Sequence, residues 1–160
     1  MSLTEFPFGL PGRVFGSPMP YGPYDQAGTV FTEVKSQNVS VVVVLVEDHE
    51  HGETIQQDLP SLYAEHGLQV IKLPIPNYGV PTVKPLEVTV LRTMEYVQAE
   101  HNALIHCSAG LGRTALFVVF LAMRVLGFSG REAIGWVGQY HPRALLTPVQ
   151  IEMILSHKGP

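Results

Sequence analysis

The chain has 160 residues, which suffices for one domain with a full hydrophobic core and is too short for two ordinary domains. Hydrophobic residues make up 46% of the chain and charged residues 15%, so neither a disordered chain nor a fibrous repeat is expected. Ten basic and fourteen acidic side chains give a net charge of -4, which excludes bulk attraction to nucleic acid or an anionic membrane. A bound anion therefore requires a local site.

The sequence contains no apolar stretch with the length of a membrane-spanning helix. The longest uninterrupted run, 115–123, falls far short of the roughly 20 residues that a span requires. The segment 1–12 has an acid, two prolines and no basic cluster, so no secretory leader is expected. Cys107 is the single cysteine, which forbids an internal disulfide and suits a reducing compartment. We expect a cytoplasmic protein that acts as a monomer, without nucleic-acid or membrane partners.

Residues 1–23 form a lead-in rich in proline and glycine, which cannot hold a regular helix. We expect it to be irregular and packed on the domain through its aromatic residues, with a short strand over 14–16. A docking peptide is the less favoured alternative. The elements expected next are a helix over 26–37, a strand over 39–46, a polar loop over 47–53, a helix over 54–66 disturbed by Pro60, a strand over 68–73, a turn-rich loop over 74–81, a helix over 84–100, a strand over 103–106, and closing helices over 114–126, 130–140 and 147–156.

This alternation of strands and helices predicts an α/β fold for residues 1–160 as a single domain. The continuous β-branched run over 39–46 is typical of a strand buried on both faces, as in a parallel sheet. The apolar residues over 84–100 recur at a spacing that places them on one helical face. We therefore expect a central, mainly parallel sheet flanked by helices.

The most informative segment is His-Cys-Ser-Ala-Gly-Leu-Gly-Arg-Thr, residues 106–114, which leaves an apolar strand and enters a helix. In a turn of this kind the backbone N–H groups and the helix dipole converge on one anion. Gly110 and Gly112 allow the backbone to curl closely around a small ligand. Arg113 can present a two-pronged fork to two phosphoryl oxygens.

Cys107 lies at the floor of this predicted cradle, where the same dipoles favour its thiolate and make it a nucleophile. Thr114 could donate a hydroxyl hydrogen bond to the sulfur, as attacking thiolate and later as leaving group. A buried, inert thiol is the commoner fate of a lone cysteine, but the glycines and Arg113 beside it argue against that interpretation.

The pattern His-Cys-x5-Arg-Thr resembles the active-site motif of the cysteine-dependent protein tyrosine phosphatase superfamily. The short chain and the segment Leu-Pro-Gly-Arg-Val at 10–14 are most similar to its small, atypical dual-specificity branch. The resemblance covers most of the chain. It implies the fold of that family, in which a sheet flanked by helices carries the phosphate loop at a strand's carboxyl end.

The resemblance also implies a role for each matching residue. Cys107 would form a phosphocysteine, Arg113 would bind the transferring phosphoryl group, and His106 would support the loop from behind. Gln150, at the start of the last predicted helix, loosely matches a glutamine that positions the hydrolytic water. No metal or other cofactor is required. The amide cradle would consist of Ser108, Ala109, Gly110, Leu111, Gly112 and Arg113.

The loop over 74–81 departs from the family pattern, because Asn77 stands where family members usually place an aspartic acid. An amide cannot protonate the departing oxygen, and general acid catalysis is typically worth about 10²–10⁴-fold. Three explanations remain open: a deliberate change that traps substrate, which we favour; a natural enzyme of low activity; or an acid recruited from Glu47, Asp48 or Glu50.

Function hypotheses from other classes are less favoured. The spacing of Gly110, Gly112 and Ala115 also fits a dinucleotide fingerprint, but a further helix follows where a strand would be needed. His49 and His51 could suggest a metal site, although a solvated loop is the better interpretation. A sulfurtransferase would have no clear need for Arg113.

We therefore expect a phosphatase acting on phosphotyrosine, with phosphoserine and phosphothreonine as further substrates. Neutral side chains in the loop argue against polyanionic phosphoinositides, for which added lysines would be expected. The main alternative is a phosphoprotein-binding module that uses the same cradle. Catalysis predicts many turnovers for each Cys107, whereas a binding module predicts at most one.

Overall fold

The computed structural model describes residues 2–54 and 57–157. Its centre is a five-stranded sheet in the order β1-β2-β5-β3-β4. β1 is antiparallel to β2, and the other neighbouring strands are parallel, which confirms the prediction of a mainly parallel sheet. The strands are β1 (Thr4–Phe6), β2 (Val14–Ser17), β3 (Val39–Val44), β4 (Gln69–Lys72) and β5 (Asn102–His106).

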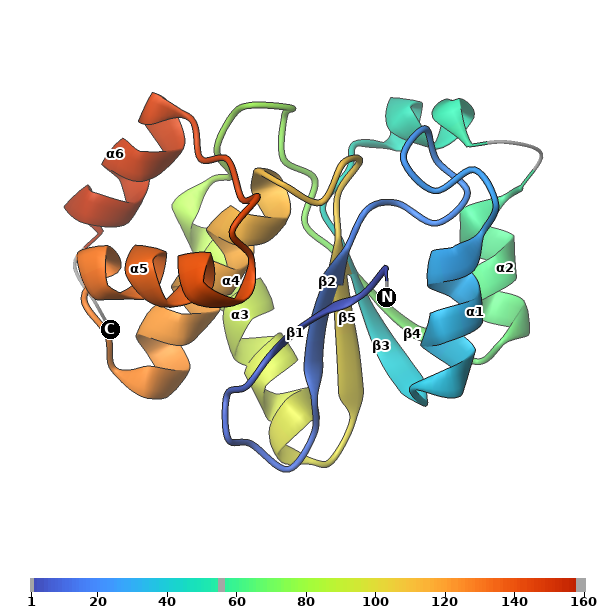
Figure 1. The fold of residues 1–160 in the computed structure, drawn as a ribbon, viewed down its shortest axis with the longest axis horizontal. Coiled ribbons are helices and arrows are strands. Elements are labelled where there is room, and N and C mark those ends of the chain that lie inside the picture. The colour runs from blue at the N-terminus through green and yellow to red at the C-terminus, as the bar shows by residue number, and fades with distance from the viewer. Residues whose placement is uncertain (1, 55–56, 158–160) are drawn as a thin grey trace.

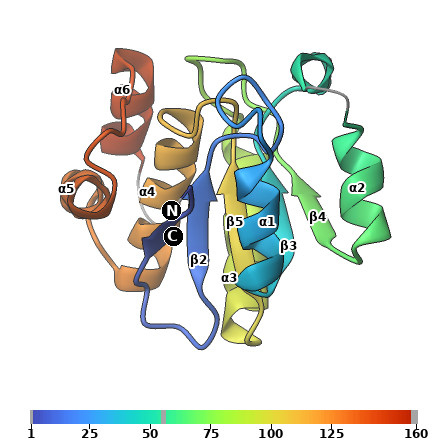
Figure 2. The same cartoon turned by 45° about the vertical axis from the view of Figure 1, so that its right-hand side comes forward.

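Helices cover both faces of the sheet, which gives a layered α/β fold (Figures 1 and 2). One group of helices lies on one side of the sheet and a second group on the other side. The first group is α1 (Thr29–Ser36) and α2 (Leu59–Glu65), and the second is α3 (Val83–Gln98), α4 (Arg113–Leu126), α5 (Gly130–Tyr140) and α6 (Pro148–Ser156); a short 3-10 helix, η1 (Asp48–Glu53), follows β3. In the second group, α6 packs on α4 and α5, and within the described ranges it does not pack directly on a strand.

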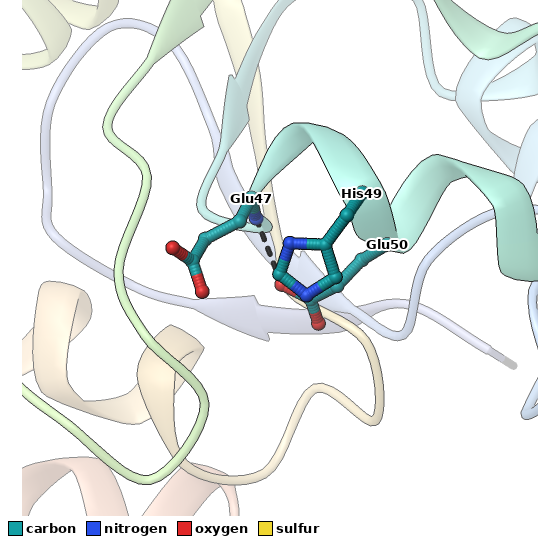
Figure 3. A group of neighbouring side chains, drawn as sticks. All are labelled: Glu47, His49 and Glu50. Atoms are coloured by element: carbon teal, nitrogen blue, oxygen red, sulfur yellow. Dashed lines mark hydrogen bonds between the residues drawn. The ribbon is translucent and has the colours of Figure 1, made fainter.

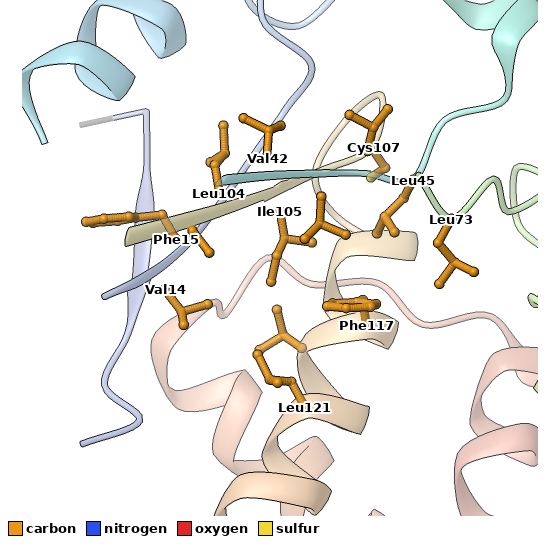
Figure 4. Close-up of a cluster of buried hydrophobic side chains, with 14 of the residues drawn as sticks. Val14, Phe15, Val42, Leu45, Leu73, Leu104, Ile105, Cys107, Phe117 and Leu121 are labelled. Atoms are coloured by element: carbon orange, nitrogen blue, oxygen red, sulfur yellow. The ribbon is translucent and has the colours of Figure 1, made fainter. Parts of the chain in front are cut away.

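The core forms where the apolar strands meet α4 (Figure 4). Val41–Val44 on β3 and Ala103–Ile105 on β5 are buried, as expected for strands covered on both faces. Every residue from Arg113 to Ala122 of α4 is also buried, because this helix lies between the sheet and the outer helices. The strand that leads to Cys107 and the helix that follows it are therefore anchored in the close-packed core of the molecule.

Most of the expected elements agree with the structure to within a few residues, and the differences have local causes. β1 was not expected; it pairs with the predicted strand, which becomes β2. The polar loop expected over 47–53 is wrong for 48–53, which form η1. The helix expected over 54–66 begins only at Leu59, because Asp58 caps it by accepting from the Ser61 backbone N–H and Pro60 fits its first turn. Residues 55–56 of that expected helix lie outside the described residues.

The parallel strands direct several loops to one edge of the sheet, at the top of Figure 1. These loops follow β2, β3, β4 and β5, and the loop that follows β5 contains Cys107. In the described part of the chain, no single helix has the length and apolar character to cross a membrane; only α4 and α5 taken together, across a bend of 116°, meet that criterion.

Candidate active site

The turn from β5 to α4 is held open by contacts to its carbonyl oxygens. Several of these oxygens accept hydrogen bonds from groups outside the turn, which turns the carbonyls away from its centre. The contacts are Met19 N–H to the Ser108 oxygen at 2.9 Å, His141 Nε2 to the Gly110 oxygen at 2.9 Å, and Leu145 N–H to the Leu111 oxygen at 2.9 Å.

Most backbone N–H groups of the same turn remain available to bind an anion. The backbone N–H of Gly110 donates to Cys107 Sγ at 3.2 Å. Within the described residues, the N–H groups of Ser108, Ala109, Leu111 and Gly112 donate no hydrogen bond. Unpaired amides beside the N-terminus of α4 form an anion-binding concavity of the kind predicted from the sequence.

The Cys107 sulfur lies at the base of this loop and is only 2% exposed as a residue. Besides the Gly110 amide, the Thr114 hydroxyl donates to it at 3.2 Å. Two donors directed at one sulfur stabilise a negative charge on that atom more than a neutral thiol. The predicted contact between Thr114 and the sulfur is therefore present.

Gly110 is required by the backbone of the loop. Its φ is +79°, a conformation that residues with a Cβ rarely adopt. A Cβ at this position would also lie 2.7 Å from the Pro18 nitrogen and 2.7 Å from the Ser17 carbonyl carbon. The segment after β2 therefore packs directly against the outside of the loop, so part of the lead-in helps to shape the site.

Arg113 is fixed by a buried ion pair that the sequence analysis did not identify. Its Nη1 donates to Glu50 Oε2 at 2.7 Å and to the Ile75 oxygen at 3.0 Å, and its Nη2 donates to Glu50 Oε1 at 2.8 Å. Three of the five guanidinium N–H donors are thus engaged. The remaining two, on Nε and Nη2, share one edge, and this edge can bind two oxygens of a phosphoryl group.

Both members of this pair keep their charge. Burial would lower the pKa of Arg113, but its hydrogen bonds and charge interaction with Glu50 outweigh burial and raise that pKa. Burial likewise opposes ionisation of Glu50, yet hydrogen bonds from Arg113 and the Glu47 backbone, together with nearby positive charge, lower the Glu50 pKa. The site therefore contains a permanent cation whose orientation is set by a carboxylate.

His106 lies behind the loop, where the family resemblance places it. Its Nδ1 is 3.1 Å from the Cys107 carbonyl oxygen and its Nε2 is 2.9 Å from the Tyr63 hydroxyl. Burial lowers the His106 pKa to about 4 and raises the Tyr63 pKa, so the imidazole is neutral and the phenol keeps its proton. Nδ1 therefore donates to the carbonyl, and Nε2 accepts from the phenol.

The loop over 74–81 is tied to α6. The Thr147 hydroxyl donates to the Tyr78 oxygen at 3.0 Å, and Gln150 Nε2 donates to the Gly79 oxygen at 2.9 Å. Gln150 is fully buried, and its Oε1 accepts from the Thr147 N–H at 3.0 Å. One end of this amide thus holds the loop and the other caps α6, and a Cβ on Gly112 would lie within 4.0 Å of both ends. Asn77 itself is exposed.

The loop after β3 brings Glu47, His49 and Glu50 together, with one potential ligand atom of each within 4.8 Å of the others (Figure 3). The sequence had suggested His49 with His51 instead. Glu50 already uses both oxygens to accept from Arg113, and Oε2 also accepts from the Glu47 N–H at 2.8 Å. A cation bound by Glu50 would have to displace the guanidinium.

Solved structures with the same fold share this arrangement of strands and helices. Tk-PTP in its active form is 33% identical, with a TM-score of 0.73 over 88% of this chain and 88% of that one. Kinase associated phosphatase (KAP) is 19% identical and has a TM-score of 0.84, with coverage of 98% and 97%. The higher score at lower identity shows that the fold tolerates extensive sequence change.

Sequence comparison assigns the family. Protein tyrosine phosphatase domain-containing protein 1 of Bos taurus is 23% identical over 130 residues, a match that covers 76% of this chain and 16% of that protein. This chain therefore corresponds to a small part of that relative. A family described as "Polymorphic toxin system, DSP-PTPase phosphatase" matches residues 20–124, more than half of the chain. The chain belongs to this DSP-PTPase phosphatase family and is of the small, atypical dual-specificity type.

Proposed function

We propose that this phosphatase hydrolyses phosphotyrosine in proteins, with phosphoserine and phosphothreonine as further substrates, through a phosphocysteine at Cys107. The observation that carries the proposal is that, within the described residues, one loop combines unpaired amides, a guanidinium edge without a partner, and a buried sulfur that accepts from the Gly110 amide and the Thr114 hydroxyl. These hydrogen-bond donors are suited to the three equatorial oxygens of a phosphoryl group in the transition state of its transfer. It uses no metal or other cofactor.

The reaction consists of two in-line displacements. In the first, Cys107 Sγ bonds to phosphorus while the P–O ester bond breaks and its electron pair stays on the leaving oxygen. In the second, water attacks phosphorus and the S–P bond breaks. The Gly110 amide and the Thr114 hydroxyl, each 3.2 Å from the sulfur, stabilise the thiolate that departs. Gln150 remains a predicted aid to the attacking water.

Asn77 makes this chain a slowed or substrate-trapping form. Its side chain has no proton to give to a leaving oxygen at physiological pH. The rest of the site retains what is needed to bind a phosphoryl group. Substrate binding is therefore kept, while the first displacement, in which the leaving oxygen departs, is slowed. Good leaving groups such as p-nitrophenolate need no protonation and should still be expelled.

A phosphoprotein-binding module is the second candidate, and Asn77 is the observation that favours it. Such a module would use the same cradle and release no more than one phosphate for each Cys107. We place either activity in a reducing, cytoplasmic setting with the chain as a monomer, in keeping with its single cysteine.

The test is phosphate release from p-nitrophenyl phosphate and from a phosphotyrosine peptide, counted for each enzyme molecule. The proposal predicts many turnovers on both compounds, and a loss of at least about 10⁴-fold in Cys107→Ser, because a serine hydroxyl is not ionised there. The control is phosphate protection of the Cys107→Ser fold against heat, which should persist. At most one phosphate for each molecule would instead identify the binding module.

A further inference from the structure

We propose that Glu47 is the residue that protonates the departing ester oxygen in this chain, at a site where Asn77 cannot. This role rests on the proposed phosphatase activity. The segment after β3 contains four carboxylates, of which Glu53 is exposed at the end of η1, and the surroundings of the other three distinguish them.

Glu50 cannot release a proton during turnover. It is 4% exposed, and its two oxygens accept from Arg113 at 2.7 and 2.8 Å. The same contacts hold its pKa below the usual range. A protonated Glu50 would lose one of these acceptors and release the guanidinium that has to bind phosphate.

Asp48 is directed elsewhere. Its side chain is 87% exposed, and one carboxylate oxygen lies 3.9 Å from Lys72 Nζ at the end of β4. An exposed carboxylate beside an exposed ammonium group is an ordinary surface pair. Asp48 is therefore paired with Lys72 on β4 at the surface and takes no part in the buried ion pair of Arg113 and Glu50.

Glu47 is the carboxylate that the fold directs to the site. Its backbone N–H donates to Glu50 Oε2 at 2.8 Å, which fixes its position at the end of β3 (Figure 3). One of its carboxylate oxygens lies within 4.8 Å of a Glu50 oxygen, and its charge contributes to the raised pKa of Arg113. In Figure 3 this carboxylate points away from His49 and Glu50. Glu47 is thus half-buried, lies next to the Glu50 carboxylate that binds Arg113, and takes no part in that ion pair.

The proposed step is balanced as follows. As the Sγ–P bond forms and the P–O ester bond breaks, the electron pair on the ester oxygen takes the proton of the Glu47 carboxylic acid. The products are an alcohol, a phosphocysteine and a Glu47 carboxylate. In the second displacement this carboxylate takes a proton from the attacking water, which restores the acid.

The experiment compares an alkyl ester, a phosphoserine peptide, with p-nitrophenyl phosphate. Glu47→Gln keeps the shape of the side chain and removes its proton, so kcat/KM for the alkyl ester should fall by about 10²-fold while that for the aryl ester falls by less than about threefold. Asp48→Asn is the matched control, because it removes the same charge one residue away. It should leave the ratio of the two rate constants unchanged.

A second arm uses the Asn77→Asp background, in which the loop again has an acid. There the effect of Glu47→Gln on the alkyl ester should shrink below about tenfold, because two donors are partly redundant. Equal losses on both esters, or no loss on either, would overturn the role of Glu47 and leave the phosphatase activity standing. An unmodified chain that fails to turn over p-nitrophenyl phosphate would instead overturn the proposed function, and this role with it.

Discussion

The loop over 107–113 and the loop over 74–81 lie at the same edge of the sheet, where Arg113 donates to the Ile75 oxygen, and they differ in how completely they are built. The first is enclosed by buried elements, and its carbonyls, its sulfur and its guanidinium all have fixed partners. The second is held at Tyr78 and Gly79 by α6, but its Asn77 and Tyr78 side chains are exposed.

This contrast teaches that binding of a phosphoryl group and protonation of its leaving group are separable properties of the fold. The cradle is specified by core packing, since the strand before it and the helix after it are both buried. The chemistry that the second loop can supply depends on one exposed position, residue 77, which can change without disturbing the core. Substitutions in the two loops should therefore have different signatures.

After the loss of the nucleophile itself, the largest effect is expected in the cradle, from Arg113→Lys. A lysine keeps the charge but has no planar fork, so it cannot hold Glu50 and two phosphoryl oxygens together. We expect kcat/KM for p-nitrophenyl phosphate to fall by about 10³-fold, with little dependence on the leaving group. Steady-state kinetics on a series of aryl phosphates measures this, and circular dichroism reports whether the fold persists. Retention of activity within tenfold would contradict the assignment of Arg113.

A gain of activity is expected in the other loop, from Asn77→Asp. The new carboxylic acid can protonate poor leaving groups in addition to Glu47, so we expect turnover of alkyl esters to rise by about 10²-fold. Turnover of p-nitrophenyl phosphate should change much less. Equal rates for both forms on alkyl phosphates would refute this prediction.

A change in stability, and not in rate, is expected from the support behind the cradle. The His106 pKa is lowered to about 4 in the folded chain from 6.5, so its contribution to stability is complete above pH 6.5 and is lost as the pH falls toward 4. The loss should reach about 3 kcal/mol at the acid end. Denaturant unfolding at several pH values measures it as the difference between the unmodified chain and His106→Asn.

The matched control for that experiment is His66→Asn, which changes an exposed histidine. It should show no comparable trend with pH. If the stability difference between the unmodified chain and His106→Asn stays constant from neutral to acid pH, burial of a neutral imidazole is not the cause.

The sequence was sufficient to predict the cradle because its determinants are local. An apolar strand, a turn with two glycines and an apolar helix follow one another within 102–126, so their geometry depends on neighbours in the chain. The contact of Thr114 with the sulfur follows from the same short spacing. The start of α2 at Leu59 was predicted wrongly, at residue 54, although the sequence contains its signals, the capping side chain of Asp58 and Pro60 in the first turn.

The partner of Arg113 could not be identified in this way, because Glu50 lies 63 positions away in the sequence. The segment around it contains two histidines and four acids, which is typical of a solvated loop. Burial of Glu50 depends on the register between β3 and β5, which brings the ends of the two strands together. β3 and β5 were both predicted as strands of a parallel sheet, so the loops that follow them reach the same edge of the sheet. An acid in the loop after β3 is the signal that could have suggested Glu50 as the partner of Arg113.

The position of β2 sets a lower limit on the length of chain that can be produced as a working unit. The segment matched by the family description, 20–124, excludes both strands on one side of β5 and the two helices that follow α4. A polypeptide trimmed to that segment would expose the backbone of β5 as an open edge and invite self-association. Expression boundaries should therefore follow the sheet rather than the sequence match.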